Sequence, residues 1–452
     1  MPLSTTVTKV IEVYIASELK RQNLGEKLLR GDLAGFESCV LTIVNEVYDR
    51  IAGSYIQNVS ISREFVNKLR EYAPQKGLYK LSSRWSKVQI GTGSYIPYKS
   101  WYAEKIAPKE GTTTTADTER HVSLSYWSCI KGASPSYYSK IGMLSVICPS
   151  FDIAKEVLLF QGTHSNTERC RQLSTALGDL SLTNRVENSL KSDETLAGER
   201  VLIAMDGGRS RIREYNGKHN DNSYECFDTP WIEPKMFVIS TLTKDGKVDK
   251  KRLPIYDCTF GDDETFALLE KYLKHLDIDK ATDVQFVADG APWIWNRVKP
   301  MLLRLGVPEN RMTETLDYYH AAEHLTDLIQ YIPKENQKEV EKKLKKQLWE
   351  GDVKQMRQTI KEVLTDLDEN DLKPFKYFEN NEKRVKYYQY NEQKLVVGSG
   401  IIESGIRRII NLRFKCPSSF WNRGSLEPLI YLRSILLAGR WLTLIDNLNK
   451  NK

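Results

Sequence analysis

Apolar residues recur at helical spacing through most of the first sixty positions of the chain. This spacing predicts one helix over residues 6–30 and a second over residues 36–51. Apolar and polar residues then alternate over residues 84–98, on either side of the glycine turn 91–94, which predicts a β-hairpin. Residues 112–117 are small and mostly polar, and we expect them to form an exposed loop.

Residues 134–180 return to a helical pattern that Gly162 interrupts. The stretch Ser165–Glu168 has the spacing of a capping box, which predicts that a new helix begins there. Helix, short turn and helix is the layout of a helix-turn-helix, so Arg169 and Arg171 on the second helix are candidate DNA contacts. An ordinary helical hairpin fits the same pattern equally well.

A polar stretch over residues 180–198 is predicted to be a linker, and the pattern beyond it is that of an α/β domain. Amphipathic helices are expected over residues 263–276 and 292–305. Five short, largely apolar segments predict the strands of a mixed sheet: 201–205, 236–242, 253–259, 284–288 and 312–316.

The remaining sequence is helical, except for a glycine break at residues 398–400. Further helices are expected over residues 401–412 and 425–442. The patterns together predict an α/β core with a helical insertion, after a mainly helical N-terminal region that contains the β-hairpin. The predicted parts are a helical and hairpin region (1–130), a helix-turn-helix-like region with its linker (131–197), the first part of the core (198–320), an all-helical insertion (321–394), and the second part of the core with basic C-terminal helices (395–452).

Composition narrows the class of protein. The chain has 452 residues, of which 40% are hydrophobic and 28% charged, and this excludes a wholly disordered chain. No apolar run approaches the roughly 18 residues of a membrane span. The first residues lack the basic and apolar regions of a signal peptide, so we expect a cytoplasmic protein. Seven scattered cysteines without a C-x-x-C pair argue against a disulfide scaffold or a structural zinc module.

Positive charge is concentrated at the end of the sequence. Lys and Arg total 66 against 59 acids, and nine of these bases but only three of the acids lie in residues 401–452. A local positive field suits a polyanion such as nucleic acid, although a solvated basic tail has the same composition. The candidate nucleic-acid contacts in this segment are Arg407, Arg408, Arg413, Lys415 and Arg423.

Two of the predicted buried strands end in an aspartate followed by glycine, at Asp206 and Asp289. The carboxyl ends of strands in α/β sheets face the crevice where such sheets hold ligands. The glycine lets the chain turn without a side chain that crowds the carboxylate. Two such carboxylates on neighbouring strands form half of a site for a hard cation. Taken singly, an Asp-Gly pair is just as typical of an ordinary turn.

A third acid, Glu403, opens the helix that follows the glycine break. Arg407 lies one turn further on the same face, where it could hold this carboxylate or a phosphate. The small residues around Glu403 are expected to leave room for a bulky substrate backbone. Two strand-end aspartates, a glutamate framed by glycines and a basic segment after it together indicate a catalytic site far more strongly than any one of them.

At these residues the chain resembles the DDE transposases of bacterial insertion sequences. The resemblance covers residues 198–440 well and the N-terminal third only loosely. Residues 398–404, Gly-Ser-Gly-Ile-Ile-Glu-Ser, are similar to the glutamate motif of that family. Residues 316–320, Leu-Asp-Tyr-Tyr-His, are similar to the short motif that precedes a helical insertion in Mutator-like relatives.

The resemblance implies an RNase H-like core in which Asp206, Asp289 and Glu403 are catalytic and hold two Mg²⁺ ions, for which Mn²⁺ would substitute. Two ions about 4 Å apart stabilise the attacking and leaving oxygens of a phosphodiester. The implied reaction is hydrolysis at the ends of a DNA element, followed by attack of the freed 3′-hydroxyl on target DNA. Asp317 and His320 are implied to lie near the site or to support it.

The partners that the resemblance implies are double-stranded DNA, both as the element's terminal inverted repeats and as the target, and a second copy of the chain that forms a homodimer when two ends are joined. No membrane is implied.

Two other interpretations stay open. The segment from His320 to His324 fits the H-x-x-E-H signature of zinc peptidases, whose two histidines lie one helical turn apart. This interpretation leaves Asp206 and Asp289 unexplained. A DNA-binding regulator derived from a transposase would fold alike and bind DNA without cleaving it.

Three tryptophans have candidate roles that differ. Trp293 and Trp295 are expected to anchor the helix after Asp289 to the sheet. Trp349 in the helical insertion is expected to pack in a core, since tryptophan is mostly buried. Stacking on a flipped base is the alternative role for Trp349.

Overall fold

The computed structural model describes residues 5–105, 119–363, 375–417 and 419–450. The chain divides into two units: residues 1–183 with 445–452, and residues 184–444. The predicted exposed loop at 112–117 lies outside the described residues.

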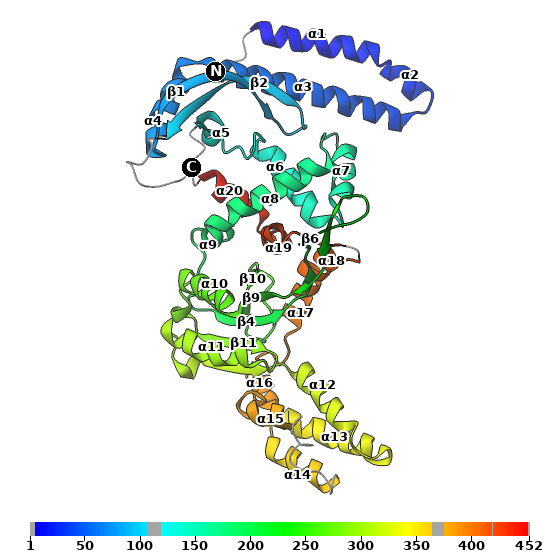
Figure 1. The fold of residues 1–452 in the computed structure, drawn as a ribbon, viewed down its shortest axis with the longest axis vertical. Helices are drawn as coiled ribbons and strands as arrows, with labels where there is room; N and C mark the ends of the chain where they lie inside the picture. The colour runs from blue at the N-terminus through cyan, green and yellow to red at the C-terminus, as the bar shows by residue number, and fades with distance from the viewer. Residues whose placement is uncertain (1–4, 106–118, 364–374, 418, 451–452) are drawn as a thin grey trace. The chain divides into compact units, whose positions relative to one another are not determined.

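The N-terminal unit begins with four helices followed by a three-stranded antiparallel sheet (Figure 1). The predicted helix over residues 6–30 is two helices, because Asn23 takes a left-handed conformation between them. The predicted β-hairpin is confirmed, and its strands pair from Gln89 with Tyr95 outward. These elements are α1 (Thr5–Arg21), α2 (Leu24–Leu29), α3 (Leu33–Ile61), α4 (Arg63–Gln75), β1 (Leu78–Gln89), β2 (Tyr95–Lys105) and β3 (Glu119–His121).

A cluster of helices completes this unit: α5 (Val122–Tyr126), α6 (Pro135–Ile147), α7 (Phe151–Phe160) and α8 (Thr167–Thr183). The predicted turn between two helices is present, with Gly162 in the left-handed region at φ +71°. The predicted capping box is wrong by one residue. Asn166 caps α8, because its side chain accepts a hydrogen bond from the amide of Arg169 at 2.7 Å.

The second unit is built on a mixed five-stranded sheet in the order β10-β9-β4-β11-β12. All five strands lie where the sequence predicts them: β4 (Arg200–Gly207), β9 (Pro234–Leu242), β10 (Ile255–Phe260), β11 (Asp283–Ala288) and β12 (Met312–Leu316). Strand β11 is parallel to both β4 and β12, whereas β9 is antiparallel to β4 and β10. The core is therefore α/β, as predicted.

Helices cover the two faces of this sheet. Alternate residues of β4, such as Ile203, join a core with α10 (Asp262–His275) and α11 (Pro292–Arg304). Trp295 is part of this core and its ring lies 6.1 Å from that of Phe286, so its expected role as an anchor is confirmed. The opposite face carries α17 (Gly400–Ile406) and α19 (Arg423–Leu437).

The predicted linker at residues 180–198 is wrong in its first half. Helix α8 continues to Thr183 and a short helix, α9 (Arg185–Ser189), follows. Ser181 and Ser189 are buried, and their hydroxyl groups find partners within the fold. Ser181 donates to the carbonyl oxygen of Leu177, and Ser189 bonds to Val186 and Tyr272.

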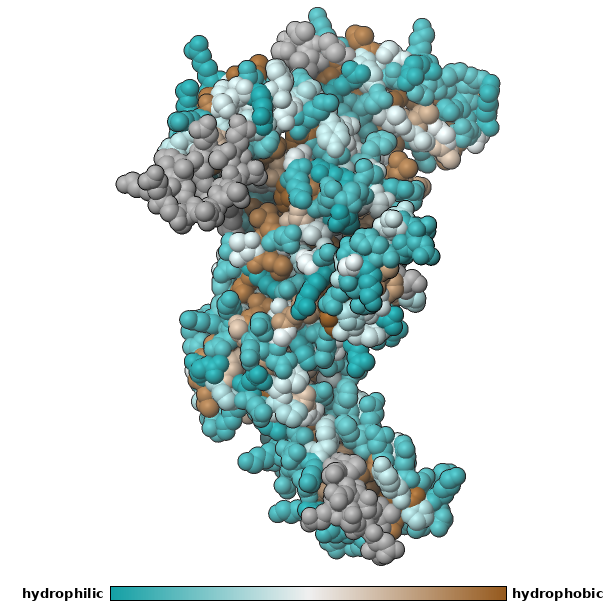
Figure 2. Space-filling model, in the orientation of Figure 1, coloured by the Kyte–Doolittle hydropathy of each residue, from teal (hydrophilic) through white to brown (hydrophobic). Residues whose placement is uncertain are grey.

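The insertion between β12 and α17 is helical in all its described parts and has a core of its own. Trp349 packs against this core, with its ring 5.3 Å from Tyr318, in agreement with the expectation of a packing role. Figure 2 shows a mostly hydrophilic surface over this region, at the lower end of the view. The helices are α12 (Tyr318–Ile329), α13 (Lys334–Glu350), α14 (Val353–Val363), α15 (Lys376–Asn380) and α16 (Tyr387–Glu392).

Two small antiparallel ribbons between β4 and β9 were not predicted: β5 (Ser210–Arg211) with β8 (Trp231–Ile232), and β6 (Glu214–His219) with β7 (Glu225–Asp228). Both are short, and β6 is exposed along its whole length, so no apolar alternation marks it.

Within the described ranges, no single helix has the length and apolar character to cross a membrane. Only α19 and α20 (Trp441–Lys450), which are bent relative to each other, meet these two criteria when they are taken together.

Candidate metal centre

Three aspartates lie side by side at one edge of the sheet. Met205 of β4 pairs with Ala288 of β11, which pairs with Leu316 of β12. The next residue on each strand is an aspartate, so Asp206, Asp289 and Asp317 follow three adjacent strand ends. The amide of Asp317 donates to the carbonyl oxygen of Ala288 at 2.8 Å, which extends the pairing past the end of β12. A parallel arrangement thus turns three distant residues into neighbours.

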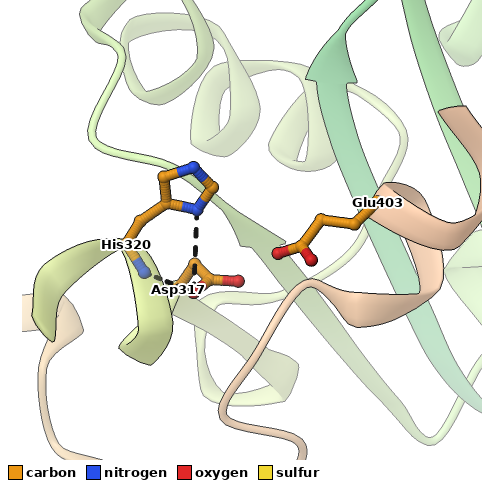
Figure 3. A group of neighbouring side chains, drawn as sticks. All are labelled: Asp317, His320 and Glu403. Atoms are coloured by element: carbon orange, nitrogen blue, oxygen red, sulfur yellow. Dashed lines mark hydrogen bonds and ion pairs between the residues drawn. The ribbon is translucent and has the colours of Figure 1, made fainter. Parts of the chain in front are cut away.

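Among the described residues, Asp317, His320 and Glu403 form a group of possible metal ligands whose ligand atoms all lie within 4.8 Å of one another (Figure 3). Neither Asp206 nor Asp289 belongs to this group. Asp317 and His320 come from the start of α12, and Glu403 reaches toward them from α17. Glu403 therefore lies beside Asp317 at the end of β12, and its convergence with Asp206 and Asp289 stays a prediction. Asp317 and His320, which sequence reasoning placed only near the site, are its closest potential co-ligands.

Asp317 is fully buried and fixes two segments at once. Its carboxylate accepts a hydrogen bond from the amide of His320, and Asp317 thereby caps α12. It also accepts a hydrogen bond from the amide of Ser399, which precedes α17. Burial alone would raise the pKa of this carboxyl group, but these hydrogen bonds prevail and lower it to about 2. Asp317 is thus a permanent anion that ties the two helices of the site together.

The chain that returns from the insertion is held against the sheet before it reaches Glu403. Gln285 on β11 is buried, and its side chain makes two hydrogen bonds to the backbone of Val396. It donates to the carbonyl oxygen of Val396 at 2.6 Å and accepts from the N–H group of Val396 at 3.1 Å. Ser399 then donates its hydroxyl group to Oε1 of Glu403 at 3.1 Å. The position of Glu403 is therefore determined by the sheet itself and by the residues just before α17.

Asp206 is half-buried, and the charges around it are mainly negative. Burial, Asp289 and Glu233 raise its pKa, whereas the amide of Gly207 and His320 lower it, and the pKa settles at about 6. A carboxylate that is desolvated beside other acids is stabilised by a cation at its oxygen atoms. The carboxylate oxygens of Asp206 and Asp289 are of the kind that suits Mg²⁺ or Mn²⁺.

His320 carries a proton at neutral pH. The neighbouring Asp317 raises its pKa to about 9, against the effect of partial burial. Its Nδ1 lies 3.8 Å from Oδ1 of Asp317, which is too long for a hydrogen bond, and this nitrogen is buried without another partner. The imidazolium is a cation beside the acids, and a metal ion on His320 would have to displace its proton.

The insertion contributes a residue that sequence reasoning missed. The ring of Tyr377 lies so close to Gly290, next to Asp289, that a Cβ on this glycine would meet it at 2.1 Å. Burial together with Asp289 and Asp317 raises the pKa of Tyr377, and its buried hydroxyl group has no hydrogen-bond partner among the described residues. No periodicity or motif in the sequence marks Tyr377. His324 packs against it at 4.0 Å between ring centroids.

The peptidase interpretation gains no support from this geometry. His324 lies against Tyr377, and the described ligand group of three contains His320 without it. The two histidines of the H-x-x-E-H segment therefore do not converge on one point.

The small residues around Glu403 differ in what surrounds them. A Cβ on Gly405 would lie 2.8 Å from the ring of Tyr256, so this glycine lets α17 pack closely on the sheet. A Cβ on Gly208 would lie 2.5 Å from Ile410, so it too allows close packing. Gly400 faces open space, as expected for a residue that leaves room beside Glu403. Passage of a substrate backbone there stays a prediction.

The predicted DNA contacts in the N-terminal unit have protein partners. Arg169 donates to the side chain of Gln89 at 2.9 Å and to the carbonyl oxygen of Lys131, so part of its guanidinium is already bound by protein, and its role as a DNA contact stays a prediction. Arg171 is exposed but pairs with Glu168 on the same helix. A guanidinium that already satisfies protein acceptors is less suited to bind phosphate.

The predicted contacts of the C-terminal segment differ from one another. Arg413 is 3% exposed and its guanidinium lies 4.7 Å above the ring of Trp421, so its prediction as a DNA contact is wrong. Arg408 bonds to Tyr256. Arg407, Lys415 and Arg423 are exposed. No ion pair joins Arg407 to Glu403 in the described part of the chain, contrary to one of its two expected roles.

Comparison with known proteins gives little beyond this geometry. No family model matches the chain, and no curated protein matches it in sequence. Among solved structures, the Drosophila P element transposase strand transfer complex is similar at 14% identity and a TM-score of 0.35, with 69% of this chain and 93% of that chain covered. A likeness at this level does not establish a shared fold.

Proposed function

We propose that this chain is a DDE-type DNA transposase that cleaves the ends of a DNA element and joins the 3′-hydroxyl ends to target DNA. The observation that supports the proposal is that Asp206 and Asp289 follow adjacent parallel strands, while Glu403 lies on a helix tied to the next strand end, at Asp317. Acids from three distant parts of the sequence have no structural need to gather at one edge of a sheet.

The order of elements supports an RNase H-like core. Three strands, a helix, a strand, a helix and a strand precede the helical insertion and the glutamate helix, which is the order that the resemblance implies. The alternation of strands and helices gives the parallel part of the sheet, and the insertion then separates the second aspartate from the glutamate.

Two divalent ions held by Asp206, Asp289 and Glu403 would supply the positive charge that phosphodiester cleavage requires. Asp317 and Ser399 hold Glu403 in place, so that the acid is preorganised before DNA arrives. His320, protonated and 37% exposed at its side chain, offers an N–H donor and a positive charge to a phosphate oxygen. Two chains would be needed to hold two DNA ends at once.

The test is cleavage of duplex DNA that carries the ends of the element encoding the chain, with Mg²⁺ or Mn²⁺. We expect nicks at the element boundary and, on addition of target DNA, joined products. Asp206→Asn, Asp289→Asn and Glu403→Gln should each abolish both products while DNA binding persists. Binding without cleavage by the unaltered chain would instead favour a regulator derived from a transposase.

A further inference from the structure

A row of arginines begins three residues after Asp206. Arg209, Arg211 and Arg213 are exposed, and the residues between them, Ser210 and Ile212, are fully buried. This alternation places the three guanidinium groups on the outer side of one extended segment. The pattern Arg-x-Arg-x-Arg is visible in the sequence, but it was not recognised as a strand.

The segment is held rigidly from its inner side. The amide of Arg213 donates to the carbonyl oxygen of Trp421, and the amide of Trp421 donates to that of Arg211 at 3.1 Å. Ser210 donates its hydroxyl group to Phe414 at 2.8 Å. The arginines therefore project from a backbone that is already ordered, which reduces the entropic cost of binding a ligand.

Aromatic rings lie between the guanidinium groups. Arg211 lies 4.6 Å from the ring centroid of Trp231, and Arg213 lies 4.4 Å from that of Phe227. Trp231 is 49% exposed and Tyr215 is 54% exposed, so their rings remain accessible. Exposed apolar rings that lie together on a surface are typical of an interaction site.

Charge on this part of the molecule is segregated. None of the three arginines makes an ion pair with a described residue. The two acids of the ribbon, Glu214 and Asp228, lie opposite each other in the register of β6 and β7. Tyr215 and Phe227 form the adjacent pair. Since neighbouring pairs point to opposite faces, the aromatic side of the ribbon lies away from its acids.

We infer that this arginine–aromatic ribbon, residues 209–215 with Phe227 and Trp231, binds the DNA strand beside the metal centre and stacks an unpaired base on Trp231. The inference rests on the proposed function. Cations that alternate with accessible rings match a single strand, whose phosphates and base faces are both exposed. In a duplex the base faces are stacked on each other, so the rings would have no use.

The test measures binding of the full chain to a fluorescein-labelled 20-nucleotide single strand and to the same strand in a duplex. Fluorescence anisotropy in EDTA keeps cleavage out of the measurement. Trp231→Ala should weaken single-strand binding about 5- to 100-fold and duplex binding less than about twofold, because stacking is lost. Trp231→Phe should restore most of the affinity, which excludes misfolding as the cause.

Arg211→Gln/Arg213→Gln should weaken single-strand binding and flatten its salt dependence by about 0.7 for each lost phosphate contact. The matched control is Lys338→Gln/Lys342→Gln, which removes two exposed charges from α13 and should leave both quantities unchanged.

Equal losses on both DNA forms in Trp231→Ala, or no loss on either, would overturn the inference. The outcome is separate from that of the cleavage test. If the chain cleaves DNA and these variants bind normally, only the proposed DNA binding by the ribbon is refuted. If the ribbon binds single strands in a chain that does not cleave, only the proposed transposase activity is refuted.

Discussion

Two aspartates of the same sheet differ in what surrounds them. Asp257 on β10 is fully buried, and its carboxylate accepts hydrogen bonds from Arg185 and Tyr272. Asp206 at the end of β4 is half-buried; Asp289 and Glu233 raise its pKa, and His320 is the side chain that lowers it. One acid is neutralised by the fold, and the other is left for a partner that comes from outside.

This difference separates a structural acid from a catalytic one more clearly than residue type or strand position does. Burial raises the pKa of both carboxyl groups, but only Asp257 has a guanidinium, that of Arg185, which opposes this effect. Asp206 raises the free energy of the empty site, and a divalent cation would remove that cost. The following variants are ways to break this comparison.

The largest effect should come from Asp206→Asn. The amide keeps the shape of the side chain and removes its charge, so we expect cleavage to fall by on the order of 10³-fold. The free energy of unfolding without metal should stay the same or rise, because a poorly compensated charge is gone. Single-turnover cleavage with Mg²⁺ and urea unfolding in EDTA measure the two quantities. A marked loss of stability would show that Asp206 is structural, like Asp257.

Asp257→Ala should act in the opposite sense. It leaves Arg185 buried with only Glu427 as its acidic partner, and we expect a loss of about 3–5 kcal/mol in the free energy of unfolding. Asp283→Ala is the matched control, since it breaks a more exposed pair with Arg200 and should cost less than about 1 kcal/mol. Equal losses in the two variants would mean that the buried network of Arg185 and Asp257 stabilises the fold no more than the exposed pair does.

Most of the second unit's fold could be predicted, because its signals are local. Each of the five strands is a short apolar run, and the helices between them have clear amphipathic spacing. The errors lie where tertiary contacts override composition. The serines of residues 180–190 suggested a linker, yet Ser189 is buried because Tyr272 supplies its partner. The ribbon at residues 209–215 was not predicted, because its buried face has only Ser210 and Ile212 and β6 is exposed throughout.

The site could be predicted only in part, for a related reason. A strand-end aspartate followed by glycine is a local pattern, which led to Asp206 and Asp289. The anchoring role of Asp317 depends on a hydrogen bond to Ser399, 82 residues away, and no local pattern encodes it. Arg413 was assigned to DNA from its charge alone, since the sequence does not reveal that its side chain packs on Trp421.

A smaller effect is expected from pH. The pKa of Asp206 is about 6 in the folded chain, above its ordinary value of 3.8, so the carboxylate takes up a proton as the pH falls through 6. Metal binding requires the ionised form, and its affinity should fall up to tenfold per pH unit below 6. Without metal, the same proton uptake should relieve the cost of the buried charge and stabilise the fold as the pH falls from 6 toward 4. Calorimetric Mn²⁺ titrations from pH 5 to 7.5 measure the affinity, and the slope should be reduced in Asp206→Asn.

The smallest effect should come from Ser399→Ala. This variant tests how the fold positions Glu403 without neutralising its charge, in contrast to the way in which Arg185 holds Asp257. The hydroxyl group of Ser399 donates to Glu403, while its amide separately binds Asp317, so alanine removes only the first hydrogen bond. One such bond contributes about 0.5–1.5 kcal/mol, and we expect cleavage to fall about 2- to 10-fold at limiting Mg²⁺, with stability unchanged.

Ser404→Ala is the matched control, because this exposed serine adjoins Glu403 on the same helix and its substitution should leave cleavage unchanged. If high Mg²⁺ restores Ser399→Ala to the full rate, Ser399 acts on metal affinity through Glu403. A defect as large as that of Asp206→Asn would contradict this supporting role and place Ser399 among the groups that contact the reacting phosphate.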